Sequence, residues 1–202
     1  LTLPRPATSL SSSFEIARMA ALSRASLILL PVLCVREEAH IRLLVFAYLA
    51  TWLPSYASFV VYPTVAPRPE TVSGEGFAVW SLLALYGADP PYNCFPSLHV
   101  GHSFVSAFAI LHVHRRVAWG AIACAALVAL STLMTKQHYV LDLVAGVALA
   151  TMSYLLFLRR CEASEVAEID RRLAPYMWLG TLFLSALITA GFAVVYSLGH
   201  SP

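Results

Sequence analysis

Charged side chains are scarce in this chain. Asp, Glu, Lys and Arg make up 12% of the 202 residues, while hydrophobic residues make up 59% and the mean hydropathy is +0.72. A soluble domain usually carries about 25% charged residues. Lysine is almost absent, since Lys136 is the only one. This balance excludes an ordinary soluble domain and predicts an integral membrane protein with membrane lipids around it and no nucleic-acid partner.

Cysteine is also sparse, and its spacing matches neither a disulfide framework nor a metal site. We therefore expect no metal and no cofactor to be held by cysteines. The four residues are Cys34, Cys94, Cys124 and Cys161.

Long apolar runs dominate the rest of the chain. A helix needs about 20 apolar residues to cross the ~30 Å hydrocarbon core of a bilayer. Suitable runs are 41–62, 117–134, 139–158 and 176–198, with 97–114 as a fifth and 16–35 as a weaker sixth. The sixth contains Arg18 and Arg24, so an interfacial helix is its alternative. The sequence predicts an all-α membrane bundle of about six transmembrane helices.

The domain organisation is simple. Residues 1–15 are rich in Pro and Ser, and we expect a flexible N-terminal tail rather than a cleavable signal peptide. Residues 16–202 then form a single transmembrane domain. The apolar stretch 77–86 is too short to span and is expected near the membrane interface.

Arginine is distributed unevenly along the predicted spans. With six spans, eight arginines share one side: Arg36, Arg42, Arg115, Arg116, Arg159, Arg160, Arg171 and Arg172. The opposite loops hold only Arg68 and Lys136. Because cytoplasmic loops are enriched in Lys and Arg, residues 62–99 and 135–138 are expected on the extracytoplasmic side.

Ionisable residues next to apolar spans are candidates for function. His138 and Asp142 are four residues apart at the start of a predicted helix, so they share one helix face. A carboxylate in that position can fix the tautomer of the imidazole and leave its other nitrogen free to attack or accept a proton. The alternative is a purely structural His-Asp pair.

A second candidate lies at the start of another predicted helix. The sequence Pro96-Ser97-Leu98-His99 places Ser97 at the N-cap and His99 in the first turn. A helix start attracts anions because its backbone N–H groups are unpaired and partly positive. A simple helix cap beside an interfacial histidine is the alternative.

Arg68 and Lys136 are the candidate cations on the same side as these histidines. Prolines on both sides of Arg68 stiffen its loop, and arginine is suited to bidentate phosphate contacts. Lys136 lies two residues before His138. An arginine near the membrane surface can also serve only as a membrane anchor.

In this order and spacing, the motifs resemble the type 2 phosphatidic acid phosphatase (lipid phosphate phosphatase) superfamily. Its three signatures read K-x-x-x-x-x-x-R-P, P-S-G-H and S-R-x-x-x-x-x-H-x-x-x-D. Arg68-Pro69 matches the end of the first, Pro96-Ser97-Leu98-His99 the second, and Ser131, His138 and Asp142 the third. The chain departs from these signatures at Val61, Leu98 and Thr132, which replace a lysine, a glycine and an arginine.

The resemblance implies a helical bundle and a phosphohistidine mechanism without a metal or other cofactor. His138 would attack phosphorus and be oriented by Asp142, and His99 would protonate the leaving oxygen. Arg68, Ser97 and Ser131 would bind the phosphate. Lys136 is a candidate to replace a lost cation. The leading function is hydrolysis of a lipid phosphate monoester or diphosphate at the outer membrane face.

Three alternatives stay open. The wording Phe-Pro-Ser-Leu-His is similar to the inositol phosphorylceramide synthase branch, which implies headgroup transfer to a lipid or alcohol acceptor. Loss of two cations would also fit a non-catalytic lipid-binding protein. His99, His102, His138 and Asp142 could together hold a metal, whereas His112 and His114 are expected in an interfacial cluster on the cytoplasmic side.

Overall fold

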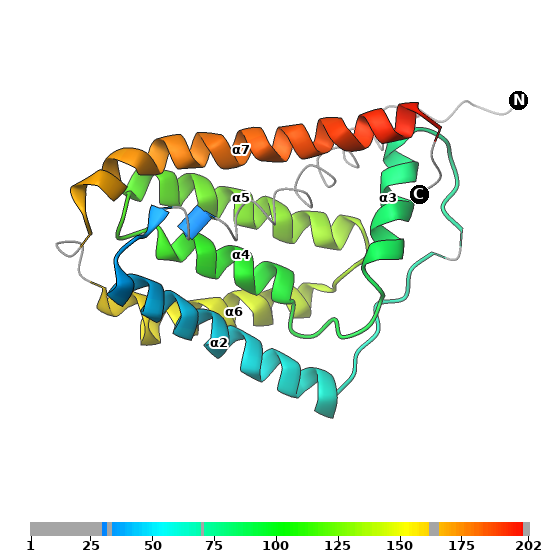
Figure 1. Cartoon of the computed structure of the whole chain (residues 1–202). Helices are drawn as coiled ribbons and strands as arrows, with labels where there is room; N and C mark the ends of the chain where they lie inside the picture. The colour runs from blue at the N-terminus through cyan, green and yellow to red at the C-terminus, as the bar shows by residue number, and fades with distance from the viewer. Residues whose placement is uncertain (1–29, 32–33, 70, 162–165, 200–202) are drawn as a thin grey trace, which may run out of the picture.

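The computed structural model of the chain describes residues 30–31, 34–69, 71–161 and 166–199, and the part that it describes is helical (Figure 1). The predicted tail and nearly all of the predicted span 16–35 lie outside these residues. The helices are α2 (Glu38–Val61), α3 (Phe77–Ala88), α4 (Leu98–Ala109), α5 (Arg115–Met134), α6 (Val140–Leu156), η1 (Leu158–Arg160) and α7 (Glu168–Ser197). The all-α prediction is confirmed.

Among the described residues, four helical stretches are long and apolar enough to cross a membrane. They are Glu38–Val61, Arg115–Met134, Val140–Arg160 and Glu168–Ser197, and they cover the predicted spans 41–62, 117–134, 139–158 and 176–198. Their surfaces carry many exposed large hydrophobic side chains, including Leu53, Val144 and Phe183. Exposed apolar faces of this extent indicate an integral membrane protein.

The prediction for residues 97–114 differs from the structure. Helix α4 has 12 residues and ends at Ala109, about 18 Å at 1.5 Å per residue. Residues 110–113 instead form turns, and the His114 side chain caps α5 by accepting a hydrogen bond from the Val117 N–H at 3.3 Å. The apolar run is therefore longer than its helix, because its last residues reverse the chain direction. The count of about six spans is not confirmed.

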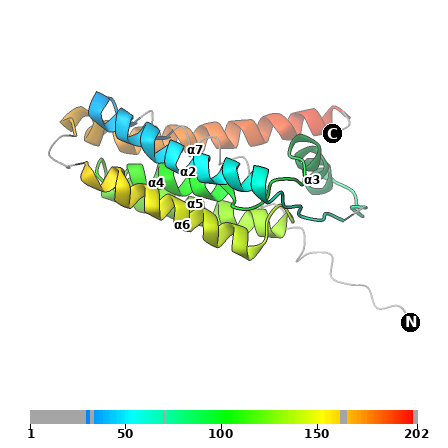
Figure 2. The same cartoon turned by 90° about the horizontal axis from the view of Figure 1, so that it is seen from below.

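Helix α4 lies inside the bundle and packs against α2, α5 and α6, as the two perpendicular views show (Figures 1 and 2). Its buried positions are mostly small residues, among them Gly101, Ser103, Ser106 and Ala107. Small side chains let helix backbones approach closely within a membrane. Consequently α4 contributes to two apolar clusters, one with α5 and α7 and one with α2 and α6.

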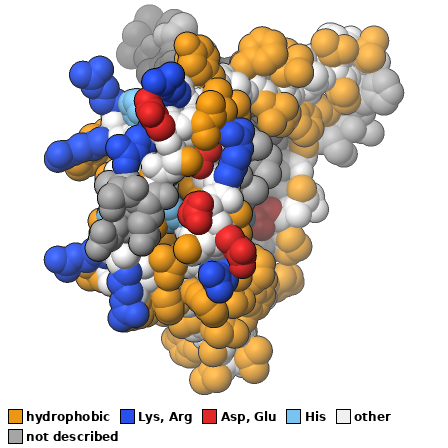
Figure 3. Space-filling model, turned by 60° about the vertical axis from the view of Figure 1, so that its left-hand side comes forward, with side chains coloured by type: hydrophobic (Ala, Val, Ile, Leu, Met, Phe, Trp, Pro, Cys, Tyr) orange, Lys and Arg blue, Asp and Glu red, His pale blue; other side chains and the backbone are white. Residues whose placement is uncertain are grey.

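The two ends of the bundle differ in chemistry. One end gathers the starts of α2, α5 and α7 together with η1, and it carries the eight arginines predicted to share a side. Figure 3 views this end, where Lys and Arg side chains gather while hydrophobic side chains cover the flanks. The other end gathers the loops after α2 and before α4 and the turn between α5 and α6. Those segments contain the candidate site residues.

Helix α3 is the short apolar helix expected from 77–86. It packs near the C-terminal end of α7 through an aromatic cluster, with ring centroids 5.4 to 6.3 Å apart between the two helices. The four rings are Phe77, Trp80, Phe192 and Tyr196. Aromatic residues favour membrane interfaces, so this end of the molecule suits a membrane–water boundary.

Candidate active site

His138 and Asp142 are brought together by the turn that joins α5 to α6. The His138 N–H bonds to the carbonyl oxygen of Thr132 at 3.3 Å, which folds the chain back onto the end of α5. Asp142 Oδ2 accepts a hydrogen bond from the Tyr139 N–H at 2.8 Å, at the start of α6, and lies 3.5 Å from His138 Nδ1. Asp142 therefore stabilises the helix start and holds its carboxylate next to His138 Nδ1, a buried atom with no hydrogen-bond partner among the described residues.

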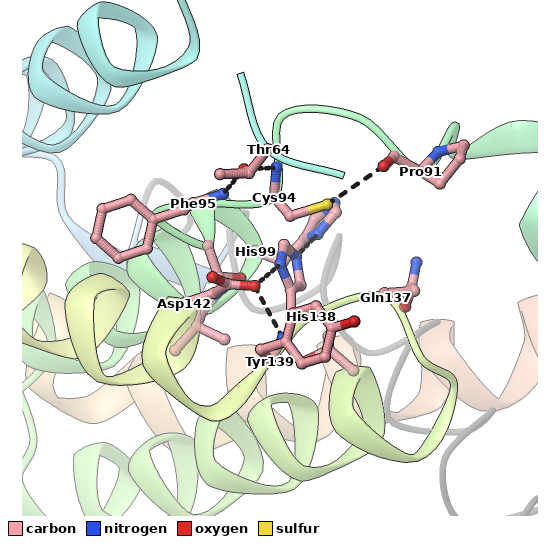
Figure 4. A network of polar contacts seen from close by, with 12 residues as sticks. Thr64, Pro91, Cys94, Phe95, His99, Gln137, His138, Tyr139 and Asp142 are labelled. Atoms are coloured by element: carbon pink, nitrogen blue, oxygen red, sulfur yellow. Dashed lines mark hydrogen bonds and ion pairs between the residues drawn. The ribbon is translucent and has the colours of Figure 1, made fainter. Parts of the chain in front are cut away.

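His99 approaches the same imidazole from α4. Its Nδ1 lies 3.3 Å from His138 Nε2 (Figure 4). Ser97 caps α4 by accepting a hydrogen bond from the Val100 N–H at 3.4 Å. The Ser97 N–H donates to the backbone carbonyl of Asp142 at 3.0 Å, so the starts of α4 and α6 are tied to each other. His138 thus has Asp142 on one ring nitrogen and His99 on the other.

The loop that carries Arg68 is fastened to the loop before α4. Thr64 Oγ1 accepts hydrogen bonds from the N–H groups of Cys94 and Phe95, at 3.0 and 2.9 Å (Figure 4). An isolated antiparallel bridge between Val65 and Tyr92 adds a second connection. These contacts bring the arginine to the site from a different part of the chain.

The Arg68 side chain is held on several sides. Its Nη1 donates to the carbonyl oxygen of Tyr86 at 3.1 Å, and its guanidinium carbon lies 4.5 Å from the centre of the Tyr86 ring. Its Nη2 lies 3.9 Å from Asp89 Oδ2. Within the described residues, the buried Nε has no hydrogen-bond partner. Arg68 is therefore oriented, and one of its buried N–H groups is left unsatisfied.

Two cavities meet at Arg68 and His138. The larger has a volume of about 520 Å³ and is lined largely by apolar groups from Ala66, Pro67, Leu133 and Val140, with Lys136 as its other cation. The smaller, of about 190 Å³, lies on the His99 side and is more polar, since Asp89, Asn93 and Gln137 line it. A phosphate beside Arg68 and His138 therefore has an apolar space and a polar space next to it.

The two predicted serines are less directly placed than the histidines. Ser97 is 1% exposed and caps α4. Ser131 is 2% exposed, and its hydroxyl donates to the carbonyl oxygen of Val128 at 2.7 Å. Neither lines the two cavities. Their predicted phosphate contacts would therefore need a rotation of the side chain or act through the N-terminus of α4.

Burial lowers the pKa of His138 below its usual range, and the Asp142 carboxylate opposes this effect. A histidine with a lowered pKa is neutral at physiological pH, and a neutral imidazole is the form that can act as a nucleophile. The electrostatics of the site therefore favour His138 in its reactive form.

The motifs do not reveal a second set of polar residues beside the site. Asp89 Oδ2 accepts from Gln137 Nε2 at 2.5 Å, and Thr135 Oγ1 donates to Gln137 Oε1 at 3.0 Å. The Tyr86 hydroxyl donates to the carbonyl oxygen of Thr135 at 2.9 Å. In the sequence, only the position of Gln137 directly before His138 indicates that this set of polar residues lies beside the site. Asp89 and Tyr86 come from a distant segment with no recognisable spacing.

The three departures from the family signatures have different surroundings. Val61, at the end of α2, is 82% exposed. Thr132 is fully buried, and its hydroxyl donates to the carbonyl oxygen of Ala129 at 2.8 Å. Leu98 lines the smaller cavity. Of the three replaced positions, only that of Leu98 therefore borders the space beside His99.

The alternative metal site is wrong. His102 does not join His99, His138 and Asp142; its ring instead contacts Tyr48 and accepts a hydrogen bond from the Trp52 indole N–H, within α2 and α4. In the part of the chain that the structure describes, no group of three or more His, Cys, Asp or Glu residues could hold a metal ion. His112 stacks on Tyr154 at the end that carries the arginines, near His114.

The arrangement combines an oriented imidazole, a second imidazole within hydrogen-bond distance, and a cation with a spare N–H. Together these groups can stabilise a phosphoryl group during attack and supply a proton to a leaving oxygen.

Comparison with known proteins agrees with this chemistry. No curated protein and no solved structure matches the chain. The family comparison matches residues 19–156, which include both candidate histidines, Arg68 and Asp142. The chain therefore belongs to the PAP2 superfamily, whose members are typically phosphatases.

Proposed function

We propose that this protein is a membrane enzyme that cleaves a lipid phosphate monoester or diphosphate through a phosphohistidine on His138. The observation that carries the proposal is the position of the His138 ring. Nδ1 faces Asp142 at 3.5 Å, Nε2 faces His99 at 3.3 Å, and Arg68 shares both adjoining cavities with it. Membership of the PAP2 superfamily supports phosphatase chemistry.

The first step is attack of His138 Nε2 on phosphorus, with the N–H at Nδ1 directed towards the Asp142 carboxylate. A phosphorus–nitrogen bond forms and the bond from phosphorus to the lipid oxygen breaks. His99 gives its proton to that oxygen. In the second step, water attacks the phosphohistidine, His99 accepts a proton from it, and inorganic phosphate leaves. His99 moves from His138 Nε2 as the substrate enters, because phosphorus must take its place.

Arg68 and Lys136 are proposed to bind the phosphate. The Arg68 Nε is buried without a hydrogen-bond partner among the described residues, so a phosphate oxygen would satisfy it. Lys136 is exposed and lines the larger cavity. Ser97 is proposed to support phosphate binding through the N-terminus of α4, and Ser131 from the end of α5. Stabilisation of charge in this way supplies most of the catalysis in phosphoryl transfer.

The proposed orientation places the site on the extracytoplasmic face. The eight arginines lie at the opposite end of the bundle from His99 and His138, as the positive-inside rule requires of a cytoplasmic end. Residues 97–114, with α4 as their helical part, would then cross as an inner element surrounded by α2, α5 and α6. With residues 16–35 as a further crossing, the proposed bundle has six spans.

The test is an assay of purified protein against a panel of lipid phosphates and diphosphates. We expect the protein to release inorganic phosphate. This activity should persist after exhaustive chelation of metal ions, because His138 rather than a metal-bound hydroxide attacks phosphorus. His138→Ala should abolish turnover, and Arg68→Ala should lower kcat/KM by about 10²-fold or more, as for loss of one charge-stabilising donor. Activity lost to chelator and restored by zinc would contradict the mechanism.

A second candidate function is transfer of the phosphoryl headgroup to an alcohol. The observation that favours it is the polar cavity of about 190 Å³ beside His99, which offers room for an acceptor hydroxyl next to the proposed base. Adding ceramide or diacylglycerol to the assay separates the two functions. Formation of a new phospholipid at the expense of inorganic phosphate would favour the transferase.

A further inference from the structure

Asp89 places a negative charge inside the proposed phosphate site. Its side chain is 32% exposed and that of Arg68 is 10% exposed, so water only partly screens the pair. Asp89 also lines the smaller cavity together with His99 and His138. A carboxylate at this position is unexpected, because it competes with the phosphate for the same guanidinium.

Among the described residues, the polar contacts of the Asp89 side chain all involve one oxygen. Oδ2 lies 3.9 Å from Arg68 Nη2 and accepts the Gln137 amide N–H at 2.5 Å. Gln137 is held in turn by the Thr135 hydroxyl at 3.0 Å, and it directly precedes His138. A single carboxylate therefore connects the proposed phosphate ligand to the turn that carries the proposed nucleophile.

The 3.9 Å separation is too long for a hydrogen bond. Arg68 is instead fixed by the carbonyl oxygen and the ring of Tyr86. Removal of the carboxylate would thus leave Arg68 in place and remove a charge that opposes phosphate binding.

We propose that Asp89 is a positioning residue that shares Arg68 with the substrate phosphate and thereby weakens the hold of the site on phosphate, so that the product can leave. The proposal rests on the proposed function, since it takes Arg68 as the phosphate ligand. A residue that only held Arg68 in place would strengthen phosphate binding, whereas Asp89 is proposed to weaken it.

The experiment measures the affinity of the purified protein for radiolabelled inorganic phosphate by equilibrium dialysis, together with kcat on the best lipid phosphate. Asp89→Asn keeps an acceptor for Gln137 and removes the charge. We expect this variant to bind phosphate about tenfold more tightly, because it lacks a negative charge close to the negatively charged phosphate. Its kcat should fall, because the product phosphate leaves more slowly. Asp89→Glu retains the charge and should therefore not show the tighter phosphate binding of Asp89→Asn.

Three further variants separate the effect of the Asp89 charge from an effect on folding. Gln137→Leu removes the neutral donor from Asp89 and leaves its charge directed at Arg68, so phosphate should bind more weakly. Glu75→Gln removes an exposed carboxylate from the loop before α3 and should change nothing. In the Arg68→Ala background, Asp89→Asn should lose its effect, since coupled residues are non-additive.

Equal or weaker phosphate binding by folded Asp89→Asn would overturn the proposal, and so would an equal effect of Glu75→Gln. Absence of saturable phosphate binding in every variant would overturn it together with the role of Arg68. If the protein binds phosphate with the expected order of affinities but hydrolyses no lipid phosphate, the proposed function and the role in product release fail, while the weakening of phosphate binding by Asp89 stands.

Discussion

At the scale of single residues, Lys136 combines an unfavourable backbone with a position at the site. Its φ is +55°, a left-handed conformation that costs a non-glycine residue about 1 kcal/mol or more. The turn between α5 and α6 would accept glycine without this cost. We infer that the lysine is kept for its charge, which faces the larger cavity.

Lys136→Gly should therefore stabilise the protein and impair its activity. We expect the thermal midpoint to rise by ~2–4 °C as the backbone strain is relieved, while kcat/KM falls by about 10²-fold with the loss of a charged phosphate ligand. Lys136→Arg is the matched control and should keep most of the activity without the gain in stability. Unchanged kinetics in Lys136→Gly would show that Lys136 does not replace the cation missing at Thr132.

The motifs predicted that four residues with recognisable chemistry lie close together, and they gave no sign of residues such as Asp89 that reach the site through contacts between loops. His99, His138, Asp142 and Arg68 lie together as their motifs implied. Asp89 reaches Arg68 and Gln137 across separate loops, and no spacing in the chain indicates such contacts.

At the scale of helices, the site depends on how closely α4 approaches α6. Gly146 is at the crossing, where an added Cβ would lie 2.6 Å from the carbonyl oxygen of Ser97 and 3.3 Å from the backbone N of Gly101. Such a contact with backbone cannot be relieved by a side-chain rotation. The crossing also holds the hydrogen bond from Ser97 to the backbone of Asp142.

Gly146→Ala should consequently separate His99 from His138. We expect a loss of stability of about 1–3 kcal/mol from overpacking and a fall in kcat of ~10²-fold, the usual consequence of misplacing a reacting group by about 1 Å. Thermal unfolding and steady-state kinetics in detergent measure both effects. Gly180→Ala in α7, where nothing lies within 4 Å of the added Cβ, is the control. Equal activity of the two variants would contradict the role of the crossing.

Hydropathy predicted the four long helices with exposed apolar surfaces, but it did not predict the length of α4, which is surrounded by other helices. The four long helices carry their apolar character on exposed surfaces, which a hydropathy window detects. Helix α4 is apolar because it is buried among other helices, so its apolar run continues through the turn at residues 110–113. Burial within protein and burial in lipid give the same local composition.

At the scale of the whole molecule, the arginines at one end and the histidines at the other predict the orientation in the membrane. Glu75 is exposed in the loop before α3, at the end of the bundle that carries the site. In a background without Cys94, Glu75→Cys should react with an impermeant maleimide in intact cells. A cysteine in place of Arg116, at the start of α5, should react only after permeabilisation. The reverse pattern would place the site in the cytoplasm.

The central claim is that His138 becomes phosphorylated while His99 acts as the acid, and trapping the phosphoenzyme tests it most directly. A nitrophenyl phosphate has a leaving group that needs no proton, so His99→Ala should complete the first step and stall before water attacks. With the phosphate of this substrate labelled, we expect an acid-labile, base-stable label that mass spectrometry assigns to His138. His138→Ala should carry none. A label that persists in His138→Ala, or no label on any residue in His99→Ala, would contradict the account.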